Sequence, residues 1–247
     1  MIRKFKPFAA LALCALACTL SCTQRTRPDE GRVRFVVRPG QTITDVTRSQ
    51  LSDYASLPDA SSFDLEIRDS YSDKVWSGKV SEWKGEITFP IGTYTVAANY
   101  GSTSVEGFGT PCLRGTGSFT VASAGEQEVE IGVSTANSLV RISCTEAFRN
   151  YFPERSFVVR TGAQTEIPFP STETRAAFID PYKFSVSGSL TTQGGKAYSL
   201  QTEEFTGLKP ATCYTVVMDV ANVGGVSVSV SFNDTVQNIQ LEVELND

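Results

Sequence analysis

A strict alternation of apolar and polar residues limits this chain to strand-rich folds. Residues 226–232 read Val-Ser-Val-Ser-Val-Ser-Phe, and residues 239–245 read Ile-Gln-Leu-Glu-Val-Glu-Leu. Successive side chains of a strand point to opposite faces, so each run places an apolar row on a core and a polar row in water. The polar link Asn233-Asp234-Thr235 predicts a hairpin between the two runs.

Weaker alternation recurs throughout the rest of the chain, with Gly, Pro, Ser and Asn between the runs. This pattern predicts many short strands and an all-β fold of antiparallel, Greek-key-like β-sandwiches. Helical signal is confined to residues 145–152, where Thr145 is the expected N-cap and Phe148, Tyr151 and Phe152 share one face. The expected strands are Arg34–Val37, Phe63–Ile67, Lys74–Val80, Glu86–Phe89, Tyr94–Tyr100, Ser118–Val121, Glu128–Val133, Leu139–Cys144, Phe157–Val159, Lys183–Leu190, Lys196–Leu200 and Tyr214–Val220.

A short internal repeat suggests how the strands are divided. A proline and three further residues precede Tyr-Thr-Val at both Tyr94 and Tyr214. The pattern is similar to the tyrosine corner of Greek-key sandwiches, in which the ring packs inward and the hydroxyl bonds to nearby backbone. We therefore expect two β-sandwich domains, at residues 32–135 and 136–247.

The first 22 residues have the organisation of a bacterial lipoprotein signal. Three cations precede an apolar run over residues 7–20, and Ser21 precedes Cys22. The run is too short to span a bilayer as a helix, which fits a cleaved signal. We therefore predict a signal peptide at residues 1–21, lipidation of Cys22, and a flexible lipid-anchored tether at residues 22–31.

Other processing routes remain open at this point. Cys14 and Cys18 are rival lipidation positions, and an ordinary secretory signal cut near Ser21 would leave Cys22 as an incidental thiol. Lipidation of Cys22 would place the protein in the bacterial cell envelope. Whether it faces the surface or the periplasm stays open.

Charge and composition exclude several functional classes. Loss of residues 1–21 removes three cations and no acids, which takes the formal net charge from −5 to −8. An acidic chain without a cationic cluster is a poor nucleic-acid binder. The chain has no histidine, which excludes Ser-His-Asp and Cys-His nucleophiles and zinc sites that contain histidine. We expect no enzymatic activity, no cofactor and no metal.

The cysteines do not form a metal or redox motif. Cys112, Cys144 and Cys213 have no Cys-x-x-Cys spacing, so buried free thiols are the default expectation. If one disulfide forms, Cys144 with Cys213 is the expected pair, because both lie in the second half of the chain.

Only one pair of residues is a candidate for ligand binding. Trp76 and Trp83 could stack on a sugar, whereas the alternative is that both cover the first core. The carboxylates at positions 126, 128 and 130, and at 242 and 244, alternate with apolar residues and are expected to be solvated strand faces that discourage edge pairing. Asp219 is a lone acid.

Several of these segments together resemble a known family. They are Lys74–Val80, the stretch Phe89–Gly101 and the ending Glu242–Asp247, which follow the lipoprotein signal. The chain resembles an uncharacterised family of lipoproteins from Bacteroidales-type bacteria, some of them fimbrillin-like. The resemblance implies a non-enzymatic, outer-membrane β-sandwich protein and transfers no functional residue except the lipidated cysteine.

Two functions follow as expectations. The first is an adhesin-like structural component of the cell surface, with other surface proteins as partners and the strand Ile239–Leu245 as a candidate for exchange between subunits. The alternative is a glycan-binding module that uses exposed aromatic residues.

Overall fold

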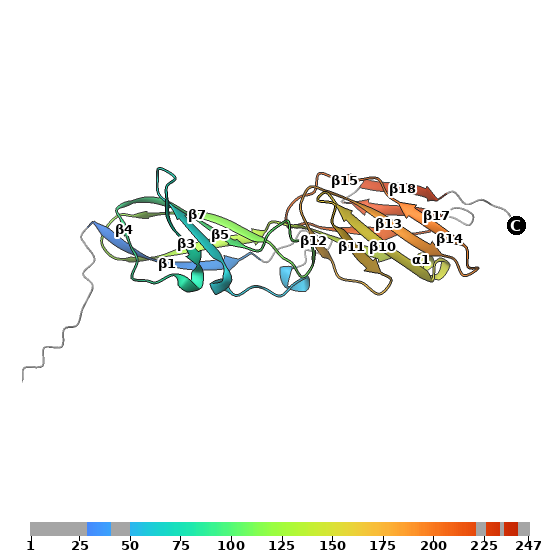
Figure 1. Cartoon of the computed structure of the whole chain (residues 1–247), viewed down its shortest axis with the longest axis horizontal. Coiled ribbons are helices and arrows are strands. Elements are labelled where there is room, and N and C mark those ends of the chain that lie inside the picture. The colour runs from blue at the N-terminus through green and yellow to red at the C-terminus, as the bar shows by residue number, and fades with distance from the viewer. Residues whose placement is uncertain (1–28, 41–49, 221–225, 233–234, 242–247) are drawn as a thin grey trace, which may run out of the picture.

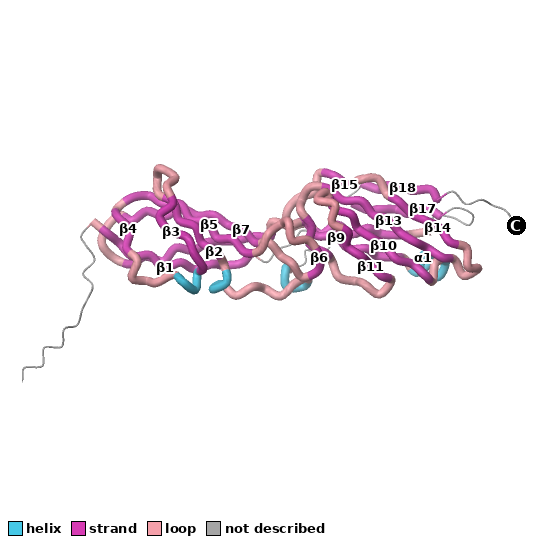
Figure 2. The backbone as a smooth tube through the Cα atoms, in the orientation of Figure 1, coloured by secondary structure: helices cyan, strands magenta, loops and turns pink. Residues whose placement is uncertain are grey.

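The computed structural model describes residues 29–40, 50–220, 226–232 and 235–241. These residues form an elongated molecule of two strand-rich lobes placed end to end (Figures 1 and 2). The predicted signal peptide, Cys22 and most of the tether lie outside the described residues. None of the helices in the described part of the chain has the length and apolar character needed to cross a bilayer.

The N-terminal lobe is built on one seven-stranded sheet. Its strand order is β3-β2-β5-β7-β8-β1-β4. Strands β7 and β8 pair only at Leu113–Thr135 and Arg114–Ser134, so the sheet divides there into two parts that enclose a core around Phe35, Ile67 and Phe89. The strands are β1 (Glu30–Pro39), β2 (Asp64–Arg68), β3 (Lys74–Lys79), β4 (Thr88–Pro90), β5 (Gly92–Tyr100), β7 (Leu113–Val121) and β8 (Glu126–Thr135).

The C-terminal lobe contains the other sheets. One has the order β11-β10-β13-β14, with β15 also paired to β13, and another has the order β16-β9-β12-β6. A second hydrophobic cluster lies in this lobe. The strands are β6 (Gly107–Phe108), β9 (Ser138–Cys144), β10 (Glu154–Thr161), β11 (Glu166–Pro170), β12 (Ala177–Ile179), β13 (Lys183–Thr191), β14 (Ala197–Gln201), β15 (Phe205–Thr206) and β16 (Cys213–Met218).

The predicted C-terminal hairpin is present. Strands β17 (Val226–Phe232) and β18 (Thr235–Leu241) pair antiparallel, with Val228 opposite Ile239. Residues 242–245 of the predicted strand Ile239–Leu245 lie outside the described part of the chain.

The helix is also where the sequence places it. Helix α1 (Glu146–Tyr151) begins after Thr145, whose hydroxyl accepts a hydrogen bond from the Phe148 N–H at 3.2 Å. Phe148 and Phe152 are buried as predicted, but the Tyr151 side chain is 43% exposed and is not part of the buried face. The described residues also contain 3-10 turns at Leu51–Asp53, Ala60–Ser62 and Val80–Glu82.

The prediction of purely antiparallel sheets is wrong in two places. Strand β1 runs parallel to β8, and β9 runs parallel to β16. In each lobe the first long strand is neighboured by a strand that comes much later in the chain. Local alternation predicts that a segment is a strand but does not say which distant strand pairs with it.

Strands β11 and β12 were not predicted, and their sequences explain why the strand signal is weak there. Strand β11 contains Pro168 and Pro170, which a strand tolerates at the edge of a sheet, and β11 is an edge strand. All three residues of β12 are buried, so the strand shows no alternation. Phe178 packs in the N-terminal cluster, whereas Ala177 and Ile179 pack in the C-terminal one.

Both predicted tyrosine corners are present. The Tyr94 hydroxyl donates a hydrogen bond to the carbonyl of Pro90 at 2.9 Å. The Tyr214 hydroxyl instead accepts one from the Lys209 N–H, also at 2.9 Å. Both rings are buried. The strands differ, since β5 is antiparallel to both of its neighbours and β16 is parallel to β9, so the repeat extends only to the local turn.

A segment of the N-terminal half crosses to the C-terminal lobe. Strand β6 pairs with β12, although it precedes the predicted boundary at residue 135. The neighbouring Glu106 carboxylate accepts hydrogen bonds from the Thr161 hydroxyl at 2.6 Å and the Asp180 N–H at 2.8 Å. Asn137, which is fully buried, accepts one from the Cys112 N–H. These bonds hold the two lobes together.

Candidate functional site

The structure brings the two tryptophans together but makes them part of the core boundary. Their ring centroids are 4.9 Å apart and the planes are nearly perpendicular, at 89°. Trp83 also stacks on Phe89 and donates a hydrogen bond from its indole N–H to the Val33 carbonyl at 3.0 Å. Trp76 and Trp83 are half-buried against the N-terminal cluster. This edge-to-face pair does not offer two parallel ring faces to a sugar.

The cysteines are not placed for the expected disulfide. Cys213 is opposite Leu139 and Cys144 is opposite Met218 in the register of β9 and β16. The two thiols are thus five residues apart along neighbouring strands, about 16 Å at the rise of a strand. A disulfide needs Cα atoms within about 7 Å. Cys112, Cys144 and Cys213 are not in disulfides. The expected pairing of Cys144 with Cys213 is therefore wrong. It was based on their location in the same half of the chain, which says nothing about strand register.

The acidic strand face of β8 is solvated, as predicted. Glu126, Glu128 and Glu130 are exposed, and the last two form ion pairs with Arg34 and Arg38 on β1. The carboxylates at positions 242 and 244 lie outside the described residues.

The lone acid Asp219 has a structural partner. Its carboxylate accepts hydrogen bonds from the Thr145 hydroxyl at 2.6 Å and from the Val220 N–H. These bonds lower the pKa of Asp219, with Thr145 as the main cause. The acid therefore supports the N-cap of α1. In the described part of the chain, no group of three or more Cys, Asp or Glu side chains is arranged to hold a metal ion.

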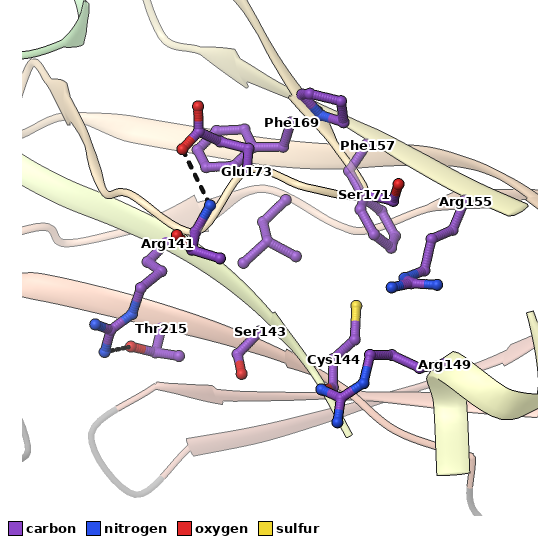
Figure 3. A pocket seen from close by; sticks show the side chains of 13 residues that line it. Arg141, Ser143, Cys144, Arg149, Arg155, Phe157, Phe169, Ser171, Glu173 and Thr215 are labelled. Carbon is purple, nitrogen blue, oxygen red and sulfur yellow. Dashed lines mark hydrogen bonds between the residues drawn. The ribbon is translucent and has the colours of Figure 1, made fainter. Parts of the chain in front are cut away.

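A polar concave site lies between the sheets of the C-terminal lobe, and we call it the arginine cleft (Figure 3). It has a volume of about 380 Å³. Strand β9 supplies Arg141 and Cys144, helix α1 supplies Arg149, and β10 supplies Arg155. Its complete lining is Arg141, Ile142, Ser143, Cys144, Arg149, Arg155, Phe157, Phe169, Pro170, Ser171, Glu173, Thr174 and Thr215.

Hydrogen bonds to neighbouring groups hold the three guanidinium groups of the arginine cleft. Arg141 donates to the Thr215 hydroxyl at 3.1 Å, and Arg149 donates to the Cys144 carbonyl at 2.6 Å. Arg155 donates to the carbonyls of Phe152 and Pro153, at 3.1 and 3.2 Å. The side chains therefore keep defined positions at the cleft wall.

The electrostatics of the arginine cleft are dominated by these cations. Glu173 is its only carboxylate, and hydrogen bonds from Arg175 lower the Glu173 pKa to about 2. Burial raises the pKa of the Cys144 thiol more than Arg155 and Arg149 lower it. At neutral pH the thiol is therefore protonated. Sequence patterns do not reveal this cluster, because its arginines come from three elements and have no motif spacing.

A second concave site lies beside α1, where Tyr151 and Tyr198 form an open groove with the β13–β14 turn; we call it the tyrosine groove. Its volume is about 540 Å³. The Gln193 side-chain amide donates to the Asn150 carbonyl at 2.8 Å, which fixes the turn against the helix. The complete lining is Ala147, Asn150, Tyr151, Thr192, Gln193, Gly194, Lys196 and Tyr198.

These features define an all-β protein of several sheets, with concave polar sites in its C-terminal lobe. The chain belongs to the family described as a domain of unknown function, DUF4493, whose model matches residues 29–247. This confirms the family resemblance seen in the sequence. No curated protein matches the chain.

Several solved structures are similar over most of their length. A fimbrial assembly protein from Parabacteroides distasonis is 8% identical with a TM-score of 0.45, covering 85% of this chain and 99% of its own. A protein provisionally assigned to cell adhesion, from Bacteroides eggerthii, is also 8% identical with a TM-score of 0.45, covering 88% and 96%. One from Bacteroides thetaiotaomicron, provisionally assigned to polysaccharide binding, is 10% identical with a TM-score of 0.44, covering 85% and 98%. These likenesses assign no ligand to this chain.

Proposed function

We propose that this protein is a non-enzymatic lipoprotein of the bacterial cell envelope that acts as an adhesin-like surface component. The observation that carries the proposal is the axial arrangement of the molecule. Strand β1 begins at one end, whereas α1 and the β13–β14 turn lie at the opposite end (Figure 1). A chain anchored before β1 would present the loops of the C-terminal lobe away from the membrane.

The tether length fits this arrangement. Seven residues separate Cys22 from the first residue of β1, Glu30. Fully extended, this segment reaches at most about 28 Å. Acyl chains on Cys22 would therefore hold the N-terminal lobe near the bilayer and leave the tyrosine groove at the far end of the molecule.

The absence of histidine supports a non-enzymatic role. Glu173 in the arginine cleft is bound by Arg175, and Asp219 at the start of α1 is bound by Thr145. Neither is part of a facing pair of carboxylates, which glycoside hydrolysis requires.

The lipid anchor is tested with variants of single cysteines. Full-length protein is expressed in a host with lipoprotein export, labelled with a palmitate analogue, and fractionated. We expect Cys22→Ala to lose the label and leave the membrane fraction, whereas Cys18→Ala, a matched change within the signal, keeps both. Labelled, membrane-bound Cys22→Ala would contradict the proposal. Protease treatment of intact cells then distinguishes the surface from the periplasmic face.

A glycan-binding role is the second candidate, and the tyrosine groove is the observation that favours it. Tyr151 is 43% exposed, and aromatic faces with adjacent amides are typical of sugar sites. Trp76 and Trp83 are less suited, because their rings are perpendicular. On a glycan array, Tyr151→Ala should lose any signal that the unaltered protein gives. Tyr71→Ala, which removes a tyrosine of the other lobe that is 86% exposed, should keep it. Equal signals would remove this candidate.

A further inference from the structure

The arginine cleft concentrates positive charge on a chain that is acidic overall. The formal net charge of the chain is −5, yet three arginines and one carboxylate line this cleft. Figure 3 shows Arg149 and Arg155 near Cys144, with Arg141 farther along β9. The positive site is therefore local and does not follow from the composition of the chain.

The charge of the cleft is not compensated by its own carboxylate. Glu173 accepts hydrogen bonds from two guanidinium nitrogens of Arg175, at 3.0 and 2.7 Å, and from two backbone N–H groups. Among the described residues, neither Arg149 nor Arg155 forms an ion pair with a carboxylate. The protonated thiol of Cys144 adds no negative charge.

Arg149 and Arg155 also keep donors available in fixed positions. A guanidinium has five N–H donors in a planar fork that matches the oxygens of a carboxylate, sulfate or phosphate. The carbonyl partners of Arg149 and Arg155 involve only one terminal nitrogen of each. Hydroxyls of Ser143, Ser171 and Thr174 also line the cleft.

The floor of the cleft strengthens its interaction with an anion. Phe157 and Phe169 line it and are 3% and 1% exposed. Charge interactions next to such an apolar surface are stronger than in bulk water. A bound anion would also relieve the repulsion between the neighbouring guanidinium groups.

We propose that the arginine cleft binds an oxyanion, a carboxylate, sulfate or phosphate group, with Arg149 and Arg155 as its principal donors and Arg141 as a third positive group. The ligand is either a free inorganic anion or an acidic sugar, which share this chemistry. The site is independent of the lipid anchor and of the tyrosine groove.

The test is a calorimetric titration of the full-length protein in nonionic detergent at constant ionic strength. The probes are inorganic sulfate, inorganic phosphate, glucuronate and, as an uncharged match to glucuronate, glucose. We expect at least one anion to bind and glucose not to bind. Tighter binding of glucuronate than of inorganic anions identifies an acidic sugar, and the reverse identifies a free anion. No binding of any anion at millimolar concentration overturns the proposal.

Two variants locate the binding. Ser171→Glu places a competing carboxylate at an exposed position of the cleft, and Thr172→Glu places it on the adjacent exposed residue outside the lining. We expect Ser171→Glu to weaken anion binding at least tenfold and Thr172→Glu to change it less than threefold. Equal effects would show a nonspecific charge effect and overturn the assignment.

A further pair removes the cations themselves. Arg149→Gln with Arg155→Gln should abolish binding. Arg160→Gln, which removes one positive charge from β10 outside the cleft, should retain it. Arg149 and Arg155 also donate hydrogen bonds to backbone carbonyls. Circular dichroism must therefore show that the double variant is folded. If it is not folded, the Ser171→Glu and Thr172→Glu comparison decides.

Discussion

Replacing Phe178 with alanine tests whether the two lobes form one folding unit. Phe178 is fully buried and lies on β12, in a sheet of the C-terminal lobe, yet its ring packs in the N-terminal cluster. Truncation of a buried phenylalanine costs about 3–5 kcal/mol, because contacts are lost and a cavity remains. Because the unfolding free energy falls by about 2 kcal/mol for each molar of urea, the midpoint of unfolding should shift to a urea concentration about 2 M lower.

Tryptophan fluorescence gives this experiment a reporter confined to one lobe. The only tryptophans of the chain, Trp76 and Trp83, pack against the N-terminal cluster. The matched variant is Phe184→Ala, whose ring is buried in the C-terminal cluster. Because β6 and Glu106 join the lobes, we expect both variants to lower the fluorescence midpoint, together with the transition seen by circular dichroism.

Two results would refute this reasoning. An unchanged fluorescence midpoint in Phe178→Ala would show that its ring does not support the N-terminal core. A midpoint that moves by circular dichroism but not by fluorescence in Phe184→Ala would show that the lobes unfold separately.

Three further predictions concern single groups. Changing Tyr94 or Tyr214 to phenylalanine keeps the ring and removes one hydrogen bond, so each variant should lose about 1 kcal/mol of unfolding free energy in urea; an unchanged midpoint in both would contradict the corner. Hydrogen bonds from Arg175 lower the pKa of Glu173 from 4.5 to about 2. The stabilising effect of this ion pair is therefore complete above pH 4.5 and is lost as the pH falls toward 2. The Glu173→Gln variant should lose less unfolding free energy than the unaltered protein over that pH range. Identical dependence of stability on pH in the two proteins would argue against the Glu173–Arg175 ion pair. The cysteines after Cys22 should titrate as three free thiols in denatured, unreduced protein, and one thiol in place of three would reveal a disulfide.

Much of the strand content could be predicted because alternation is a local signal. The segment Lys183–Leu190, for example, lies within β13, where Phe184, Val186 and Leu190 on one face meet a core. Strand β12 escaped prediction because both of its faces are buried. The tyrosine corners were also predictable, because their proline, turn and tyrosine are adjacent in the chain.

The candidate sites could not be predicted in the same way. Arg141, Arg149 and Arg155 read individually as ordinary surface cations, and only the packing of β9, α1 and β10 brings them to one cleft. Tyr151 was expected on the buried face of α1, but it is 43% exposed and lines a groove. A helical face is broad, so the sequence does not reveal which residue at its margin remains in water.

By itself, the sequence determined the all-β class, the capped helix, the two tyrosine corners and the absence of histidine chemistry. Each of these depends on residue type or on neighbours within a few positions. Only the tertiary structure decided the parallel pairs β1–β8 and β9–β16, the separation of Cys144 from Cys213, and the arginine cleft. These depend on contacts between segments that are far apart in the chain, which local patterns do not encode.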